Sequence, residues 1–349
     1  MAVKMNARRE QYEKSYGKRA HTIPALYFPK REYAMSHTNV VNRPLFLVIK
    51  AWGTMMTAFC LALFTAIPAM AEESGASASP APSMTELNKK LTNPVSDLWS
   101  ISFQQNNYLL SIPGHGSSNW ESNLQFQPVM PVAITSDWNL ITRPVIPLFT
   151  SVPYTRQTSN PTPHEELARS TAFGDTILME MVSPSPKVSG NWLLGVGPTF
   201  IFPTASNTHN GQGKWQVGPA AIVGYLSHEW IVGAFMQDWV SFAGQQNREA
   251  VHQMNLQPFA AYFLPDGWSI GYSGNILANW QAASSNDVWT VPVGLGVYRV
   301  VKIGSVPVKI GVAGQYMPIH PKVFGQQWNF QLSVSPVIPK LITGNLFGN

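Results

Sequence analysis

Two histidine-containing segments hold residue types that could do chemistry. His115, in PGHGSSN, lies beside Ser117 and Ser118, which are the residue types that a hydrolase uses as base and nucleophile. A nucleophile needs its base within hydrogen-bond reach and a third group that orients the base. Nothing in the spacing specifies that geometry, so the segment is interpreted as a polar loop and no catalytic residue is assigned.

The second segment, PHEELARS, places His164 next to Glu165 and Glu166. These are metal-ligand types, but three adjacent positions do not converge on one ion by themselves. The glycine-containing segments GVGPTF and GLGVYRV have no helix after them and are not phosphate-binding loops. No metal and no cofactor are therefore predicted, and these glycines are interpreted as small inward positions that leave room in a lumen.

The polar residues that remain follow a period of two. In WNFQLSVSPV, Trp328 and Phe330 alternate with Asn329 and Gln331, which is typical of a strand with one apolar and one polar face. The polar faces carry amides and hydroxyls, and only 12% of the chain is charged, against about 25% in soluble domains. An enclosed aqueous lumen explains such a face better than bulk solvent does, and the apolar face then contacts lipid.

The same alternation predicts which polar side chains line the lumen. An unpaired charge facing lipid is costly, so inward placement is favoured. The predicted lumen-lining residues are Glu121, Gln125, Gln127, Arg143, Glu180, Lys214, Gln216, Asn255, Gln257, Lys309 and Gln331. Two interpretations stay open for their charges: they line a pore and tune solute preference, or they pair across the lumen and plug it.

Alternating segments recur along the chain and define the fold class. The sequence predicts an all-β, transmembrane antiparallel β-barrel of about 12 strands (range roughly 10–14). The predicted strands are 98–109, 119–129, 137–149, 174–183, 190–203, 214–226, 229–242, 253–264, 267–279, 288–301, 305–317 and 328–338.

Tryptophans and loop lengths support a barrel that spans a membrane. Trp99, Trp120, Trp138, Trp192, Trp215, Trp230, Trp268, Trp289 and Trp328 lie near predicted strand starts. Because successive strands run in opposite directions, these residues should form one aromatic belt at each membrane interface. Long polar connections alternate with short turns, as in outer-membrane barrels; the longest expected loop is 150–173.

The N-terminal part is interpreted as a leader. Arg43, the apolar stretch 51–67 and the Ala69-Met70-Ala71 site are typical of a cleaved signal peptide, with the cut after Ala71. A single transmembrane anchor is the alternative. A start set too early, with Met35 as the true start, would explain residues 1–42. The domain prediction is 1–71 leader, 72–97 Ser/Ala/Pro linker with a short helix over 84–91, and 98–349 barrel.

Charge and cysteine content exclude some functions. The formal charge of +5 comes from residues 1–50, which hold ten Lys/Arg and three Asp/Glu. Nucleic-acid binding is therefore not predicted. The only cysteine, Cys60, lies in the leader, so the mature chain would have no disulfide and no thiol chemistry.

Several of these segments resemble a known bacterial family. They include LTNPVSDLWSISFQQN, NLITRPVIPLF, WLLGVGPTFIFPTA and FQLSVSPVIPKL, and the resemblance runs from about Leu91 to the end. The family comprises outer-membrane proteins named for the MetA pathway of phenol degradation, also mislabelled neuromedin U or putative transporters. The resemblance implies an outer-membrane barrel that passes hydrophobic or aromatic small molecules, and it brings no catalytic residues. The chain departs from the pattern at its leader and at Asn349, where an aromatic residue is usual.

The functional prediction is a channel or transporter for passive passage of small molecules in a bacterial outer membrane. Its partners are the lipid bilayer and a small-molecule solute, and a homo-oligomer is left open. Two other functions remain as alternatives: a barrel enzyme that acts on lipid, and a closed structural or adhesive barrel.

Overall fold

The computed structural model describes residues 82–115, 119–158, 164–342 and 344–347. The predicted signal peptide and start site lie outside these residues. Among the described residues, no helix is long and apolar enough to cross a membrane. The helices are α3 (Met84–Thr92), α4 (Pro186–Ser189) and the 3-10 turns η2 (Pro265–Gly267) and η3 (Ser285–Asp287). The strands are β1 (Ser100–Ser111), β2 (Asn119–Ala133), β3 (Trp138–Thr158), β4 (His164–Phe173), β5 (Thr176–Pro184), β6 (Trp192–Phe202), β7 (Lys214–Leu226), β8 (Trp230–Gly244), β9 (His252–Phe263), β10 (Trp268–Ser273), β11 (Ile276–Asn279), β12 (Trp289–Ile303), β13 (Val306–Ile319) and β14 (Gly325–Pro336).

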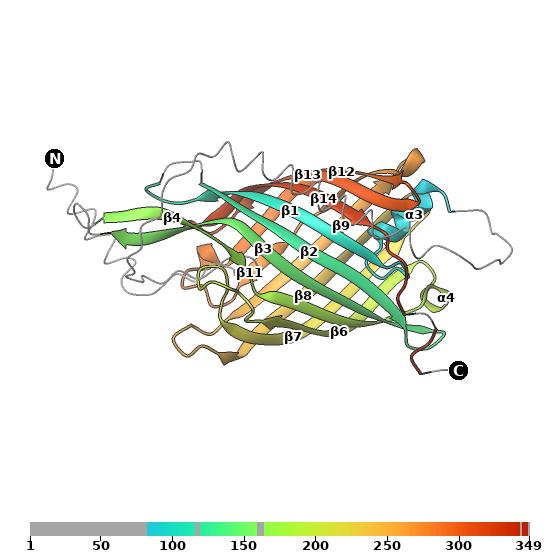
Figure 1. Ribbon diagram of the computed structural model, residues 1–349, viewed down its shortest axis with the longest axis horizontal. Helices are drawn as coiled ribbons and strands as arrows, with labels where there is room; N and C mark the ends of the chain where they lie inside the picture. Colours follow the sequence, from blue (N-terminus) through green and yellow to red (C-terminus); the bar gives the residue numbers. More distant parts are fainter. Residues whose placement is uncertain (1–81, 116–118, 159–163, 343, 348–349) are drawn as a thin grey trace. The chain divides into compact units, whose positions relative to one another are not determined.

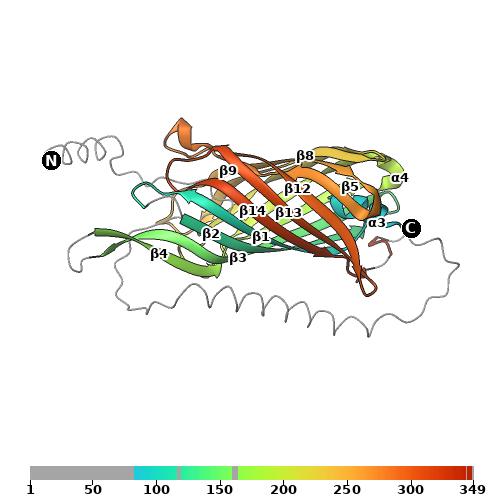
Figure 2. The same ribbon diagram turned by 90° about the horizontal axis from the view of Figure 1, so that it is seen from above.

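These strands form one antiparallel sheet that closes on itself (Figures 1 and 2). Most strands pair with their neighbours in sequence, and β1 pairs with β14 to complete the ring. Two of the barrel's strands are each interrupted: β4 and β5 pair with successive parts of β3, and β10 and β11 both lie between β9 and β12. The described residues therefore form a 12-strand barrel, as the sequence predicts. Closure pairs the backbone groups without leaving a sheet edge in lipid.

The two faces of the strands differ in chemistry as predicted. Along β14, Trp328 and Phe330 are 42% and 51% exposed on the outer face, whereas Asn329 is 2% exposed and faces inward. Trp192, Leu194 and Val196 on β6 follow the same outward rule. The exposed apolar side chains thus form the outer surface, which is the surface that lipid would cover.

The aromatic belts have one exception. Trp99 is 4% exposed, and its Nε1 donates to the carbonyl oxygen of Pro131 at 2.7 Å. The prediction that Trp99 belongs to a belt was therefore wrong. The residue lies just before β1, where the chain leaves the lumen, so its indole packs inward instead of against lipid.

The longest expected loop also differs from the prediction. Residues 150–173 are not one loop: β3 continues to Thr158 and β4 returns along it, with Leu148 opposite Phe173. Because β4 pairs only with β3, this hairpin continues beyond the closed sheet as a two-stranded ribbon (Figure 1, green, at the left). Its Arg156 Nε donates to Glu166 Oε1 at 2.8 Å, an exposed ion pair that links the two strands.

Prolines within the strands sit beside interruptions of the pairing. Pro292 lies at the register shift between β12 and β13, and Pro198 faces Pro219 where the pairs of β6 with β5 and of β7 with β8 break off. A proline has no backbone donor for the ladder, so bulges and breaks are where it is tolerated.

Candidate functional site: the lumen and its plug

Helix α3 lies at the end of the barrel where the short turns are (Figure 1). Its N-terminus has a complete capping box made by Ser83 and Glu86. Asn88 is fully buried, and its Nδ2 donates to the Gly267 carbonyl at 2.9 Å and to Ser269 Oγ at 3.0 Å. These bonds fix the helix to η2 and β10. The short helix expected from the sequence is therefore an anchored part of the barrel end, a contact that the alternation pattern could not reveal.

The segment after α3 enters the lumen. At its start, Thr92 Oγ1 accepts a hydrogen bond of 2.5 Å from Lys309 Nζ on β13. Three residues later, Val95 packs in an apolar cluster with Ile141 of β3 and Met181 of β5. Residues 92–95 thus reach from one wall towards another, and together with α3 they form a plug, defined here as Ser83–Trp99.

A cavity of about 220 Å³ lies between the plug and the lumen wall. One wall is polar and includes Gln104, Gln127, Arg143 and Gln331. The other is apolar and comes from β8 and β9, with Ile231, Phe235, Phe259 and Ala261. A smaller cavity of about 50 Å³ shares Gln127, Arg143 and Phe235 and continues away from the plug. The space beside the plug therefore has both hydrogen-bonding and apolar surface.

Two tyrosines lie against the wall of this cavity because glycines leave space for them. A Cβ at Gly311 would meet Tyr298 Cδ1 at 2.0 Å, and a Cβ at Gly274 would meet the Tyr272 hydroxyl at 2.3 Å. Tyr272 also donates to the Pro292 carbonyl at 2.6 Å. Neither ring was predicted from the sequence. The segment GLGVYRV held the signal, since Gly296 and Tyr298 are two apart and share a face.

Gly311→Ala is expected to push the Tyr298 ring off the wall and into the cavity. Overpacking of this kind costs about 1–3 kcal/mol of folding stability, and we expect a lower urea midpoint together with reduced ion conductance in planar bilayers. Gly314→Ala is the matched control, because a Cβ at Gly314 of the same strand meets nothing within 4 Å. Equal midpoints and conductance for the two variants would contradict this account of the cavity wall.

Amide side chains fill the part of the lumen next to the smaller cavity. Asn106 Nδ2 donates to Asn123 Oδ1 at 3.2 Å, Gln125 Nε2 donates to the same oxygen at 3.3 Å, and Gln127 Nε2 donates to Gln125 Oε1 at 2.6 Å. Asn329 Nδ2 extends this chain of bonds to Asn106 at 3.3 Å. Buried amides need such partners, so the ladder keeps this part of the lumen polar and filled.

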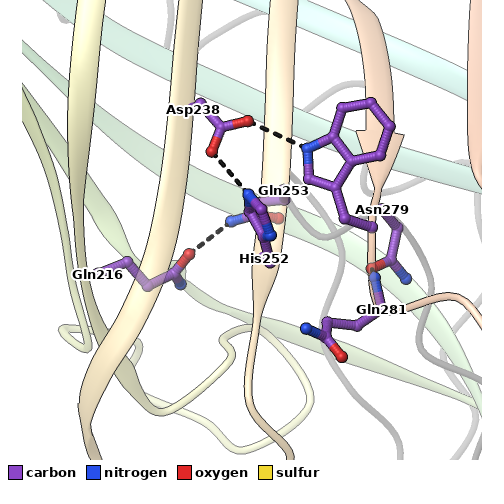
Figure 3. A network of polar contacts seen from close by, with 7 residues as sticks. Gln216, Asp238, His252, Gln253, Asn279 and Gln281 are labelled. Atoms are coloured by element: carbon purple, nitrogen blue, oxygen red, sulfur yellow. Dashed lines mark hydrogen bonds and ion pairs between the residues drawn. The ribbon is translucent and has the colours of Figure 1, made fainter.

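A second polar network shows both faces of the wall (Figure 3). Gln253 on β9 donates from Nε2 to Gln216 Oε1 at 2.8 Å, and both side chains are 1% exposed inside the barrel. Its neighbour His252 points to the other face, where its Nε2 lies 2.9 Å from Asp238 Oδ1. Trp280 Nε1 donates to the other oxygen of Asp238 at 3.0 Å. Adjacent residues therefore serve a lumen network and an outer-surface network.

The predicted lumen residues fall into three groups. The first lines the two cavities and comprises Gln125, Gln127, Arg143, Asn255, Gln257, Lys309 and Gln331. In the second group, Glu121 and Gln216 are buried on the inward face at 0% and 1% exposure. Lys214 makes up the third group at the start of β7, where its Nζ donates to the Gln245 carbonyl at 2.7 Å.

Glu180 does not join them, and its predicted inward position was wrong. Met179 and Met181, taken as outward, are 2% and 1% exposed inside the barrel, so Glu180 faces outward. Its Oε2 accepts a 2.7 Å hydrogen bond from Thr142 on the neighbouring strand. The physical reason is that this stretch of lumen is filled by apolar side chains, so the methionines belong inside.

The histidine segments remain without an assembled site among the described residues. His115 donates its backbone N–H to the Ile112 carbonyl at 3.2 Å, as in a turn. Ser117 and Ser118 lie outside the residues that the structure describes. Within the described part of the chain, no three His, Cys, Asp or Glu residues are placed to hold a metal ion. Glu165 and Glu166 lie on the β3–β4 ribbon.

Asp175 ties the long loop 203–213 to the barrel. Its carboxylate accepts backbone N–H bonds from Gln212 at 2.6 Å and from Ala205 at 3.1 Å. Burial raises the pKa of this carboxyl, although these donors and the charge of Arg248 oppose the shift. The loop thus folds back over the rim.

Fold and lumen together define the class: a membrane-spanning, 12-strand β-barrel with an internal N-terminal plug.

No protein-family model and no curated protein sequence match the chain. It is similar to the solved structure of an outer membrane channel from Pseudomonas putida F1, with 13% identity, a TM-score of 0.46, and 76% of this chain and 99% of that chain covered. It is also similar to the NanC porin, at 8% identity and TM-score 0.41 over 69% of this chain and 99% of that one. A third similar structure is a Pseudomonas aeruginosa FadL homologue, at 10% identity and TM-score 0.32 over 70% of this chain and 90% of that one.

Proposed function

We propose that this protein is a bacterial outer-membrane channel or transporter that passes small molecules through a plugged lumen. The observation that carries the proposal is the cavity between the plug and the barrel wall, which offers amide, basic and apolar surface within one closed barrel. The exposed apolar outer face supports insertion in a bilayer, because a closed antiparallel barrel satisfies its backbone there. The mixed lining favours solutes with some apolar surface, including aromatic ones.

We further propose that the chain belongs to the family named for the MetA pathway of phenol degradation. The support is the sequence resemblance of the segments from about Leu91 onward. Under this proposal the residues that line the two cavities, and not loop histidines, select the solute.

Planar bilayers containing the purified full-length protein test the transport proposal. We expect discrete conductance steps of small size, because the plug and the amide ladder occupy the lumen. Liposomes loaded with an apolar dye should exchange it faster with the protein than without it. If neither conductance steps nor solute exchange occur, a closed structural or adhesive barrel becomes the better account. Lipid hydrolysis lost in His115→Ala would instead favour a barrel enzyme.

A further inference from the structure

The cavity beside the plug has a one-sided charge. The described residues that line it include the cations Lys90, Arg143 and Lys309. They include no Asp and no Glu. Lys90 has a carboxylate nearby, since its Nζ lies 3.6 Å from Asp97 Oδ1 on the plug. The charged side chains that line the cavity are therefore all cationic, and the lumen around it holds mostly neutral amides and hydroxyls, with Glu121 as a buried inward-facing carboxylate on β2.

Lys309 is the cation most clearly directed at this space. Its Nζ donates to Thr92 Oγ1 at 2.5 Å and lies 5.0 Å from the centre of the Tyr298 ring. Both contacts are with neutral groups, which orient an ammonium but do not neutralise it. An ammonium with neutral neighbours in a confined site gains free energy when an anion enters beside it.

The opposite wall of the cavity is apolar and would bind the apolar part of a ligand. Ile231, Phe235 and Phe259 present apolar surface to the same cavity. At about 220 Å³ the cavity is smaller than the pockets of about 300–1,000 Å³ that hold drug-sized ligands. Its occupant should therefore be small, with an apolar body and one polar end.

We propose that this cavity binds a small amphipathic carboxylate, such as an arylalkanoate, with its carboxylate at Lys309 and its apolar body against Phe235 and Phe259. This inference rests on the proposed transport function and names the solute class for it. Arg143, whose Nη2 donates to Gln127 Oε1 at 3.0 Å, lines both this cavity and the smaller one. A neutral hydrocarbon would use only one of the two walls.

Calorimetric titration of the purified full-length protein with 3-phenylpropanoate and with 3-phenylpropan-1-ol tests the assignment. The two ligands share an apolar body and differ in charge. We expect the carboxylate to bind roughly tenfold more tightly, the value of one hydrogen bond to a charged group. Lys309→Met should remove this preference, Lys309→Arg should retain it, and Lys302→Met, at an exposed lysine of β12, should leave it unchanged.

Two results would overturn the assignment: equal affinity for the acid and the alcohol, or an unchanged preference in a folded Lys309→Met protein. Bilayer conductance separates this failure from that of the transport function. Conductance without a carboxylate preference overturns the solute class alone. Carboxylate binding without conductance or solute exchange supports the site and overturns transport.

Discussion

Leu332→Arg is expected to lower the free energy of unfolding by about 2–4 kcal/mol, the cost of a cationic side chain that faces lipid near the bilayer midplane. Leu332 lies in the middle of β14 on the outer face and is 37% exposed there. Its neighbour Ser333 faces the lumen and lines the larger cavity. Ser333→Arg should therefore cost less, because the new charge lies in the polar lumen and not in lipid, although Lys309 and Arg143 of the same cavity repel it.

The measurement is urea unfolding of both variants in lipid bilayers, followed by tryptophan fluorescence and by heat-modifiable gel mobility. Equal losses for the two neighbours would mean that the inward and outward faces are wrongly assigned. Because adjacent residues on one strand are compared, differences in expression or in overall charge do not explain an unequal result.

Deleting residues 83–97, which make up all of the plug except Leu98 and Trp99, is expected to raise single-channel conductance several-fold. The deletion removes α3 and the chain that reaches from Lys309 towards Ile141 and Met181. The wall of the barrel keeps its pairing, since β1 begins only at Ser100. The ladder of amides remains as a filter, so the deletion variant should still discriminate by solute size.

Asn88→Leu gives a milder version of the same test without shortening the chain. It removes the bonds to Gly267 and Ser269 and leaves a buried polar partner unsatisfied. We expect more frequent open events at a conductance between those of the full-length and the deleted protein. If both variants conduct like the full-length chain, the plug does not limit flow.

Much of the fold could be predicted because the governing rule is local. A period of two reports which face of a strand is apolar, and it places Trp328 and Asn329 on opposite faces without knowledge of any partner strand. The same rule failed at Glu180, because alternation gives two faces and not which of them is inside. Met179 and Met181 look like lipid-facing residues, and only the apolar cluster around Val95 shows that they are internal.

The plug and the cavity could not be predicted for a related reason. Asn88 and Gly267 are 179 residues apart in the sequence, and neither residue type predicts that the two are in contact. The anchoring of α3 depends on where the barrel end lies in space. The position of the Tyr298 ring on the wall could have been inferred, because Gly296 and Gly311 leave room for it. That inference requires the pairing of β12 with β13, which the sequence alone does not give.

The pairing of β1 with β14 has a consequence for biogenesis. Ser335 Oγ donates to Ser102 Oγ at 2.9 Å across 233 residues, so the first and last strands of the ring can meet only after β14 has been made. Until then, both would expose unpaired backbone to neighbouring chains. Closing so long a loop is slow, so we expect the unclosed polypeptide to need shielding from aggregation on its way to the bilayer.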